Sequence, residues 1–202
     1  MDNIINQKNV SDLERLISIF LSSAHEDDDD YMKAACNIIS IGQEGFEYLF
    51  AHLLEFDEHR KRASIFALAS GNIHRIELIN SFKELLLDNH DLIVSEAIDG
   101  IAKLGTADDW EVVKNFLNHS SPYVRGAVIR FARKRLEKNI SFEILTKLLD
   151  DKHFIVIKNA IDELGELGLK EAIPYIDKFI NYHHADVRDA AKSALKSLRE
   201  NS

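Results

Sequence analysis

Apolar residues recur at helical spacing along nearly the whole chain. Between residues 121 and 135, for example, Val124, Ala127, Val128 and Phe131 fall on one helical face when successive residues are placed 100° apart. A sustained alternation of apolar and polar residues, which is typical of half-buried strands, is almost absent. The pattern therefore predicts an all-α protein.

Aligning the chain on one small residue reveals a repeated unit. Alanine recurs at intervals of 29, 34, 30, 33 and 30 residues, at Ala34, Ala63, Ala97, Ala127, Ala160 and Ala190. A small side chain lets two helices approach to the short end of the usual ~8–10 Å interaxial distance. Six further amphipathic segments lie between the anchored helices, at about 12–22, 45–56, 75–88, 107–118, 140–150 and 170–182. Each unit is therefore predicted to be a helical hairpin.

Helix ends are marked in the same register. Eight residues after four of the alanines comes a glycine, at Gly42, Gly71, Gly105 and Gly168, which suits a left-handed residue just beyond a helix. Ser121 followed by Pro122 is typical of a helix start, and Thr106 with Asp109 resembles a capping box. In the fourth unit Arg135 replaces the glycine, so that helix is predicted to run on through Leu136 towards Asn139.

A lone hairpin cannot bury its apolar face, so neighbouring hairpins must stack into one continuous core. The expected fold is a right-handed α-solenoid that forms a single domain over residues 1–202. Its six hairpins are expected at about 11–42, 43–71, 74–105, 106–138, 140–168 and 170–200.

One segment carries a family resemblance. The sequence KEAIPYIDKFINYHHADVRDAAKSALKSL, residues 170–198, resembles the short HEAT-like repeat of phycobilisome-lyase-type and many other bacterial proteins. The Ala-Ile-Pro of the first helix, the Asp-Val-Arg that opens the second and the following Ala-Ala pair carry this resemblance. SPYVRGAVIRFA and NHDLIVSEAIDGIAKLG match it more loosely, and the resemblance extends over about residues 29–198. It implies a HEAT-like fold and says almost nothing about function.

The amino-acid composition and the net charge exclude several classes of protein and of partner. Hydrophobic residues make up 46% and charged residues 29% of the 202 residues, as in ordinary globular proteins. The net charge of −9 argues against general binding to nucleic acid or to anionic membranes. Cys36 is the single cysteine, which excludes an intramolecular disulfide and favours a cytoplasmic location. The apolar stretch LISIFLSSA, residues 16–24, follows acids and is too short to span a bilayer, so we expect a core helix there.

The nine histidines do not predict a metal site. His90, His153 and His183 each stand seven residues before an anchor alanine, which makes a row along one edge of a solenoid. Repeats stack roughly 10 Å apart. Zinc ligands must lie about 2 Å from the ion, so adjacent repeats cannot share one ion. We expect polar loop residues here, with residues 183–186, HHAD, as a local alternative.

Two enzyme families with similar repeats have catalytic motifs that this sequence does not match. Iron hydroxylases of this architecture use matched His-Glu pairs, whereas this chain has only His25-Glu26. HEAT-like DNA glycosylases need a basic concave face with aromatic side chains and an acid, whereas Trp110 is the single tryptophan here. No nucleophile triad or phosphate-binding loop stands out, and Cys36 fits a buried filler. The sequence therefore predicts no catalytic residues, no metal and no cofactor.

The stretch SPYVRGAVIRFARKRLEKN, residues 121–139, holds six cations and one acid. Arg125 occupies the Val-Arg slot of the repeat and is expected to be a structural ion-pair partner. Arg135 and Lys138 come late enough to compensate the helix dipole. These three cations thus have structural explanations.

The other three cations, Arg130, Arg133 and Lys134, share an adjoining face that is either a solvated surface or a binding patch. Arg60, Lys61 and Arg62 of the second hairpin offer a continuation of such a patch. The leading prediction is a non-catalytic protein-interaction module, such as a bacterial adaptor, a chaperone-like subunit or an immunity-type binder, that docks a partner with an acidic surface. Nucleic-acid binding or repair is the alternative, and a subunit of a bilin-lyase-type enzyme is the third.

Overall fold

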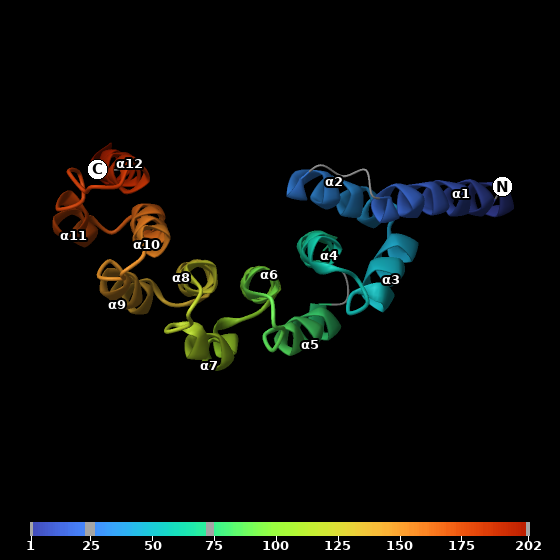
Figure 1. Cartoon of the computed structure of the whole chain (residues 1–202), viewed down its shortest axis with the longest axis horizontal. Coiled ribbons are helices and arrows are strands. Elements are labelled where there is room, and N and C mark those ends of the chain that lie inside the picture. Colours follow the sequence, from blue (N-terminus) through green and yellow to red (C-terminus); the bar gives the residue numbers. More distant parts are fainter. Residues whose placement is uncertain (1, 23–26, 72–74, 201–202) are drawn as a thin grey trace. The chain divides into compact units, whose positions relative to one another are not determined.

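A computed structural model describes residues 2–22, 27–71 and 75–200 and shows only helices, turns and loops among them (Figure 1). Close contacts group the chain into two compact units, residues 1–104 and 105–202. The helices of the N-terminal unit are α1 (Asp2–Leu21), α2 (Asp28–Ile39), α3 (Gln43–His52), α4 (Glu58–Gly71), α5 (Arg75–Leu85) and α6 (Asp91–Leu104).

The C-terminal unit also consists of hairpins, and the first helices of its first and last hairpins are short and partly of 3-10 type. Its elements are η1 (Ala107–Asp109), α7 (Trp110–Val113), η2 (Lys114–Phe116), α8 (Pro122–Arg135), α9 (Lys138–Leu148), α10 (Phe154–Leu167), η3 (Lys170–Ala172), α11 (Ile173–Asp177) and α12 (Ala185–Glu200). The predicted all-α solenoid of six hairpins is confirmed.

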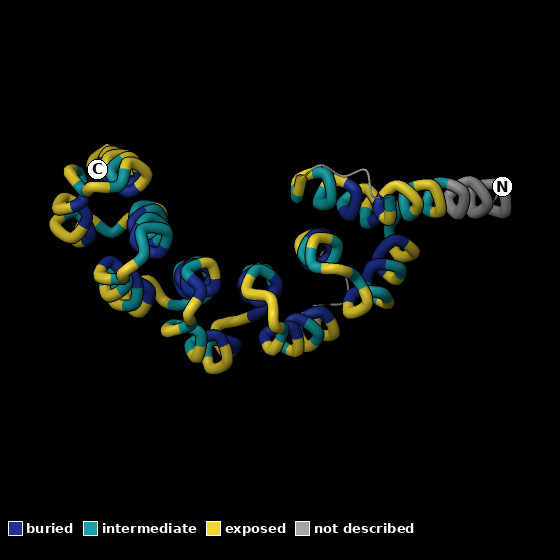
Figure 2. Tube along the Cα trace, in the orientation of Figure 1, coloured by how far each residue is buried: buried dark blue, intermediate teal, exposed yellow. Residues whose placement is uncertain are grey.

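Within each unit the second helices of successive hairpins pack against one another. In the N-terminal unit α2 contacts α4 and α4 contacts α6, and in the C-terminal unit α8 contacts α10 and α10 contacts α12. The six anchor alanines lie on these helices and are 0–7% exposed. Their burial confirms the predicted role of a small residue at the helix contacts, and the buried positions of each helix face its neighbours (Figure 2).

Two of the four glycines of the repeat adopt positive φ. Gly168, with φ 73°, ends α10 in the left-handed conformation, as predicted. Gly42, with φ 96°, forms the turn between α2 and α3. Gly71 differs, because it is the last residue of α4 and its φ is not positive. The capping box of Thr106 and Asp109 is confirmed, with the Thr106 amide donating to Asp109 Oδ2 at 2.7 Å.

The predicted extension of the fourth second helix is wrong. Helix α8 ends at Arg135, and Leu136 is extended, with φ −95° and ψ 161°. The buried hydroxyl of Ser141 donates to the carbonyl of Ala132 at 2.8 Å, which satisfies the end of α8 from the following helix. Lys138 consequently belongs to α9, and the missing glycine does not lengthen α8.

Candidate functional site

Four side chains share one face of α8, namely Tyr123, Arg130, Arg133 and Lys134, and we call them the α8 stripe. Their spacing places them beside the buried face formed by Val124, Ala127, Val128 and Phe131. Tyr123 is 50% exposed, Lys134 is exposed, and the two arginines are partly buried. Helix α8 contains five cations and no acid, and Tyr123, Arg130 and Lys134 of the stripe each have a further contact within the chain.

Helix α10 supplies an acid beside this stripe. Glu163 forms an ion pair with Arg133, and its side chain is largely buried. Burial raises the pKa of Glu163, while the positive charges of Arg133 and Arg130 act in the opposite direction. Arg133 is therefore partly neutralised and held in place, and Lys134 is exposed and also has a contact within the chain.

Asn159 of α10 packs directly against α8. A Cβ atom on Gly126 would lie 2.4 Å from Asn159 Nδ2, so only glycine allows this contact without a shift. The Asn159 amide forms no hydrogen bond within the described part of the chain. It therefore places an unused donor and acceptor next to the α8 stripe.

Arg125 has the structural role predicted for it. Its side chain is 5% exposed and binds Asp151 with two hydrogen bonds of 2.8 Å, from Nε and from one terminal nitrogen. The other terminal nitrogen donates to the carbonyls of His119 and Ser120. Asp151 belongs to the loop before α10, so this fork ties two successive hairpins together.

Comparisons with known proteins agree with this architecture. Residues 110–196 match the family of HEAT repeats. The match lies within the C-terminal unit, which therefore resembles HEAT repeats in sequence. The chain is similar in structure to an engineered protein of the Northeast Structural Genomics Consortium, with a TM-score of 0.55, 18% identity and coverage of 95% of this chain and 98% of that one.

A second similar structure is the complex of CpcE and CpcF of phycocyanin lyase from Nostoc sp. PCC7120. The TM-score is 0.52 with 17% identity, covering 92% of this chain and 82% of that one. No curated protein matches the chain in sequence. At these identities the structural similarity shows the fold alone.

Arg60 and Lys61, the predicted continuation of the patch, have contacts inside the N-terminal unit. Arg60 donates to the carbonyls of Phe20, Leu21 and Ser22 at the end of α1 and pairs with Asp57. Lys61 lies 3.3 Å from Asp88 in the loop before α6. Both side chains are 15% exposed, so each has a structural task within the repeats.

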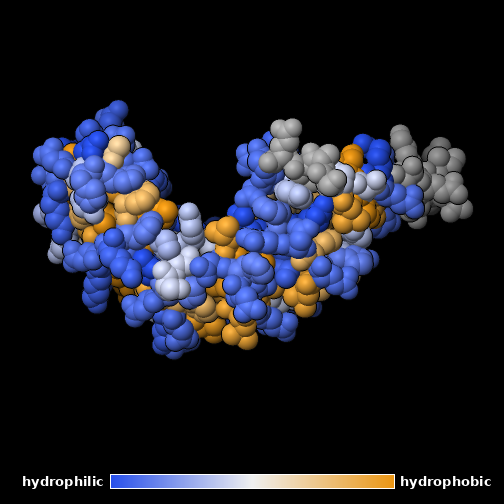
Figure 3. Space-filling view, viewed as in Figure 1, coloured by the Kyte–Doolittle hydropathy of each residue, from blue (hydrophilic) through white to orange (hydrophobic). Residues whose placement is uncertain are grey.

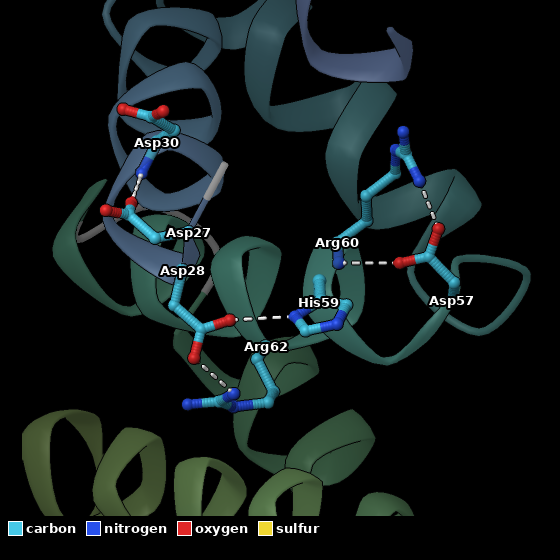
Figure 4. A network of polar contacts seen from close by, with 7 residues as sticks. All are labelled: Asp27, Asp28, Asp30, Asp57, His59, Arg60 and Arg62. Carbon is cyan, nitrogen blue, oxygen red and sulfur yellow. Dashed lines mark hydrogen bonds and ion pairs between the residues drawn. The ribbon is translucent and has the colours of Figure 1, made fainter. Parts of the chain in front are cut away.

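A further polar network links the second helices of the first two hairpins (Figure 4). Asp27 caps α2 by accepting from the amide of Asp30 at 3.0 Å. Asp28 reaches α4, where His59 Nδ1 and an Arg62 nitrogen each lie 2.8 Å from its carboxylate. The hydrogen bond from His59 lowers the pKa of Asp28, and the Arg62 contact adds to this effect against burial. The sequence did not indicate this bridge, because its partners are more than 30 residues apart.

Among the repeated histidines, His153 is the N-cap of α10. His153 Nδ1 accepts from the amide of Ile155, and Asp151 accepts from the amide of His153. Asp88 and His90 repeat the latter contact in the loop before α6, two hairpins earlier. Among the described residues no group of three or more His, Cys, Asp or Glu side chains could hold a metal ion. His25 and Glu26 lie outside the described residues.

Proposed function

We propose that this HEAT-like repeat protein is a protein-interaction module that docks an acidic segment of a partner protein on the α8 stripe. The observation that carries the proposal is the coincidence of three cations with a half-exposed tyrosine on one helix face. Tyrosine and arginine are the residue types that most often dominate binding energy at interfaces. HEAT-like solenoids expose extended surfaces suited to such partners.

The neighbouring helix supports a protein partner in particular. The Asn159 amide beside the stripe has the donor and the acceptor that an extended backbone segment needs. Glu163 and Glu166 on α10 oppose a continuous polyanion, which favours a partner with a few acids over a phosphate backbone. We therefore propose a protein partner, and binding to nucleic acid would be recognised in the test as capture that disappears with nuclease.

The proposed docking surface consists of residues of α8 alone. A role of Arg60 and Lys61 in partner binding stays a prediction, since contacts in the N-terminal unit account for both side chains. A cytoplasmic location and a bacterial setting likewise stay predictions. No described helix has the combination of length and apolarity that a bilayer-spanning segment requires. The similarity to phycocyanin lyase concerns the fold, so a lyase activity is not part of the proposal.

The experiment is affinity capture from nuclease-treated native lysate, followed by mass spectrometry. The stripe variant is Arg130→Gln with Lys134→Gln, which spares Arg133 and its ion pair with Glu163. The matched control is Lys192→Gln with Lys196→Gln, which removes the same charge from exposed positions on α12. A partner protein captured by the wild type and the control but lost with the stripe variant supports the proposal. Capture that disappears with nuclease, or that is equal for all three chains, overturns it.

A further inference from the structure

A groove lies on the side of the C-terminal unit formed by the first helices of its last two hairpins. Asn139, Phe142 and Glu143 of α9 line one side, and Leu169 with Glu171 of η3 line the other. Its volume is about 460 Å³, within the ~300–1,000 Å³ typical of ligand-binding clefts. We call it the outer groove. It is built from elements other than α8, so it is separate from the α8 stripe.

The floor of the outer groove is apolar and fixed in place. Phe142 and Leu169 are partly buried and pack against the hydrophobic core of the unit. The ring of Phe142 meets Tyr175 of α11 edge to face, with centroids 5.6 Å apart. Tyr175 is itself 43% exposed, and Ile140 of α9 is half exposed. A side chain placed on this floor would therefore meet an aromatic surface that needs no rearrangement.

Apolar residues break the hydrophilic surface of the C-terminal unit in Figure 3. Isolated exposed apolar residues are common on monomeric proteins, but an apolar floor enclosed by a polar rim indicates an interaction site. The outer groove combines both kinds of residue, because the polar Asn139, Glu143 and Glu171 line it together with the apolar Phe142 and Leu169.

The rim of the outer groove carries a single sign of charge. Glu143 and Glu171 are exposed, come from opposite sides and form no ion pair within the described part of the chain. Lys138 and Lys170 are adjacent in sequence to lining residues but do not line the groove. The Asn139 amide makes no hydrogen bond among the described residues, so it is available to a bound backbone. Carboxylates on both sides complement cations that flank an apolar anchor.

We infer that the outer groove docks a partner segment in which an aromatic or aliphatic side chain is flanked by lysines or arginines. The apolar anchor packs on Phe142 and Leu169, and the flanking cations pair with Glu143 and Glu171. This surface selects a charge pattern opposite to that proposed for the α8 stripe. The chain thus has two docking surfaces of different specificity in the same unit.

The test uses the full chain and synthetic heptapeptides with a central phenylalanine and two lysines on each side. Binding is followed by fluorescence anisotropy and by amide chemical shifts of the ¹⁵N-labelled protein. We expect shifts centred on residues 139–143 and 169–175, with weaker binding at high salt because exposed charges are screened. A peptide with serine for phenylalanine and one with glutamates for the lysines should each bind at least fivefold more weakly.

Variants separate the outer groove from general acidity of the chain. Glu143→Lys with Glu171→Lys should weaken the lysine peptide about tenfold, the upper range for two exposed ion pairs. Glu166→Lys with Asp189→Lys makes the same charge change on α10 and α12 and should leave the affinity within twofold. Shifts that map elsewhere, no measurable binding, or equal losses in both variants would overturn the inference.

Discussion

Arg125 and Arg188 hold the same place in two hairpins but have different partners. Arg125 binds the carboxylate of Asp151 and two carbonyls, whereas Arg188 donates to the carbonyls of Tyr182 and His183. Replacing Arg125 by methionine leaves a largely buried carboxylate without its cation. The shared slot therefore allows a comparison between an arginine that neutralises an acid and one that binds only the carbonyls of the loop before α12.

We expect Arg125→Met to lower the free energy of unfolding by about 3–5 kcal/mol, as for other broken buried ion pairs. Arg188→Met loses only hydrogen bonds to carbonyls and should cost about 1–2 kcal/mol. Urea denaturation followed by circular dichroism measures both values. Equal losses in the two variants would show that the Asp151 contact contributes nothing specific.

The bridge from Asp28 to His59 and Arg62 predicts a pH dependence. The pKa of Asp28 is below its ordinary value in the folded chain, chiefly because of the hydrogen bond from His59. A lowered folded pKa means that the stabilisation is complete above the unfolded pKa, near 4, and is lost as the pH falls through the folded pKa. Asp28→Asn should therefore cost about 0.5–1 kcal/mol at pH 7, since the pair is partly exposed.

The difference between wild type and Asp28→Asn should shrink towards zero as the pH falls below 4. Thermal unfolding at a series of pH values measures it. Asp30→Asn is a suitable control, because the amide of Asp30, and not its carboxylate, bonds to Asp27. A difference between wild type and Asp28→Asn that persisted unchanged in acid would contradict the bridge.

At the scale of the helices, α10 and α12 approach closely where glycine faces alanine. A Cβ atom on Gly165 would lie 2.9 Å from Ala194 Cβ and 3.1 Å from its Cα. Gly165→Ala should therefore push the helices apart and destabilise the protein by about 1–3 kcal/mol, despite the better helix propensity of alanine.

Adding Ala194→Gly to Gly165→Ala restores the space and should recover most of that loss. The two substitutions exchange the residues across the contact, so their helix-propensity effects nearly cancel. A double-mutant cycle of denaturation midpoints tests this rescue. Destabilisation that is simply additive would mean that the two helices do not touch at this point.

Helical spacing and the alanine register were sufficient to predict the hairpins, because burial of one small residue per repeat leaves a visible period. The end of α8 was not predictable in the same way. Leu136 is neither glycine nor proline, and the cap comes from Ser141 of the next helix. A local pattern cannot reveal a helix end that a neighbouring hairpin stabilises.

Among the candidate surfaces, a feature within one helix was predictable from the sequence, whereas one formed by different hairpins was not. The cations of α8 were visible as a charged run in one helix, and Arg125 was assigned to its ion pair from its place in the repeat. The outer groove was not visible, since Phe142 and Leu169 come from different hairpins and each resembles an ordinary core residue. Arg60 was grouped with the basic patch because the sequence does not show the carbonyls of α1 that it caps.

At the scale of the whole molecule, the C-terminal unit has a core of its own. One cluster of buried residues extends from Ile129 to Leu198 and draws every member from that unit. We expect residues 105–202, expressed alone, to be helical and to unfold cooperatively in urea. A fragment with weak helicity and a gradual transition would support the prediction, made from the sequence, of one domain over residues 1–202.

The central claim is that the α8 stripe binds a partner protein. Calorimetric titration of a captured partner into three purified chains tests it most directly. We expect the variant Arg130→Gln with Lys134→Gln to bind the partner at least tenfold more weakly, while the melting temperature of this variant stays close to that of the wild type. Lys192→Gln with Lys196→Gln should bind as the wild type does. Equal affinities for all three chains would contradict the account and leave the cations of α8 as a solvated face.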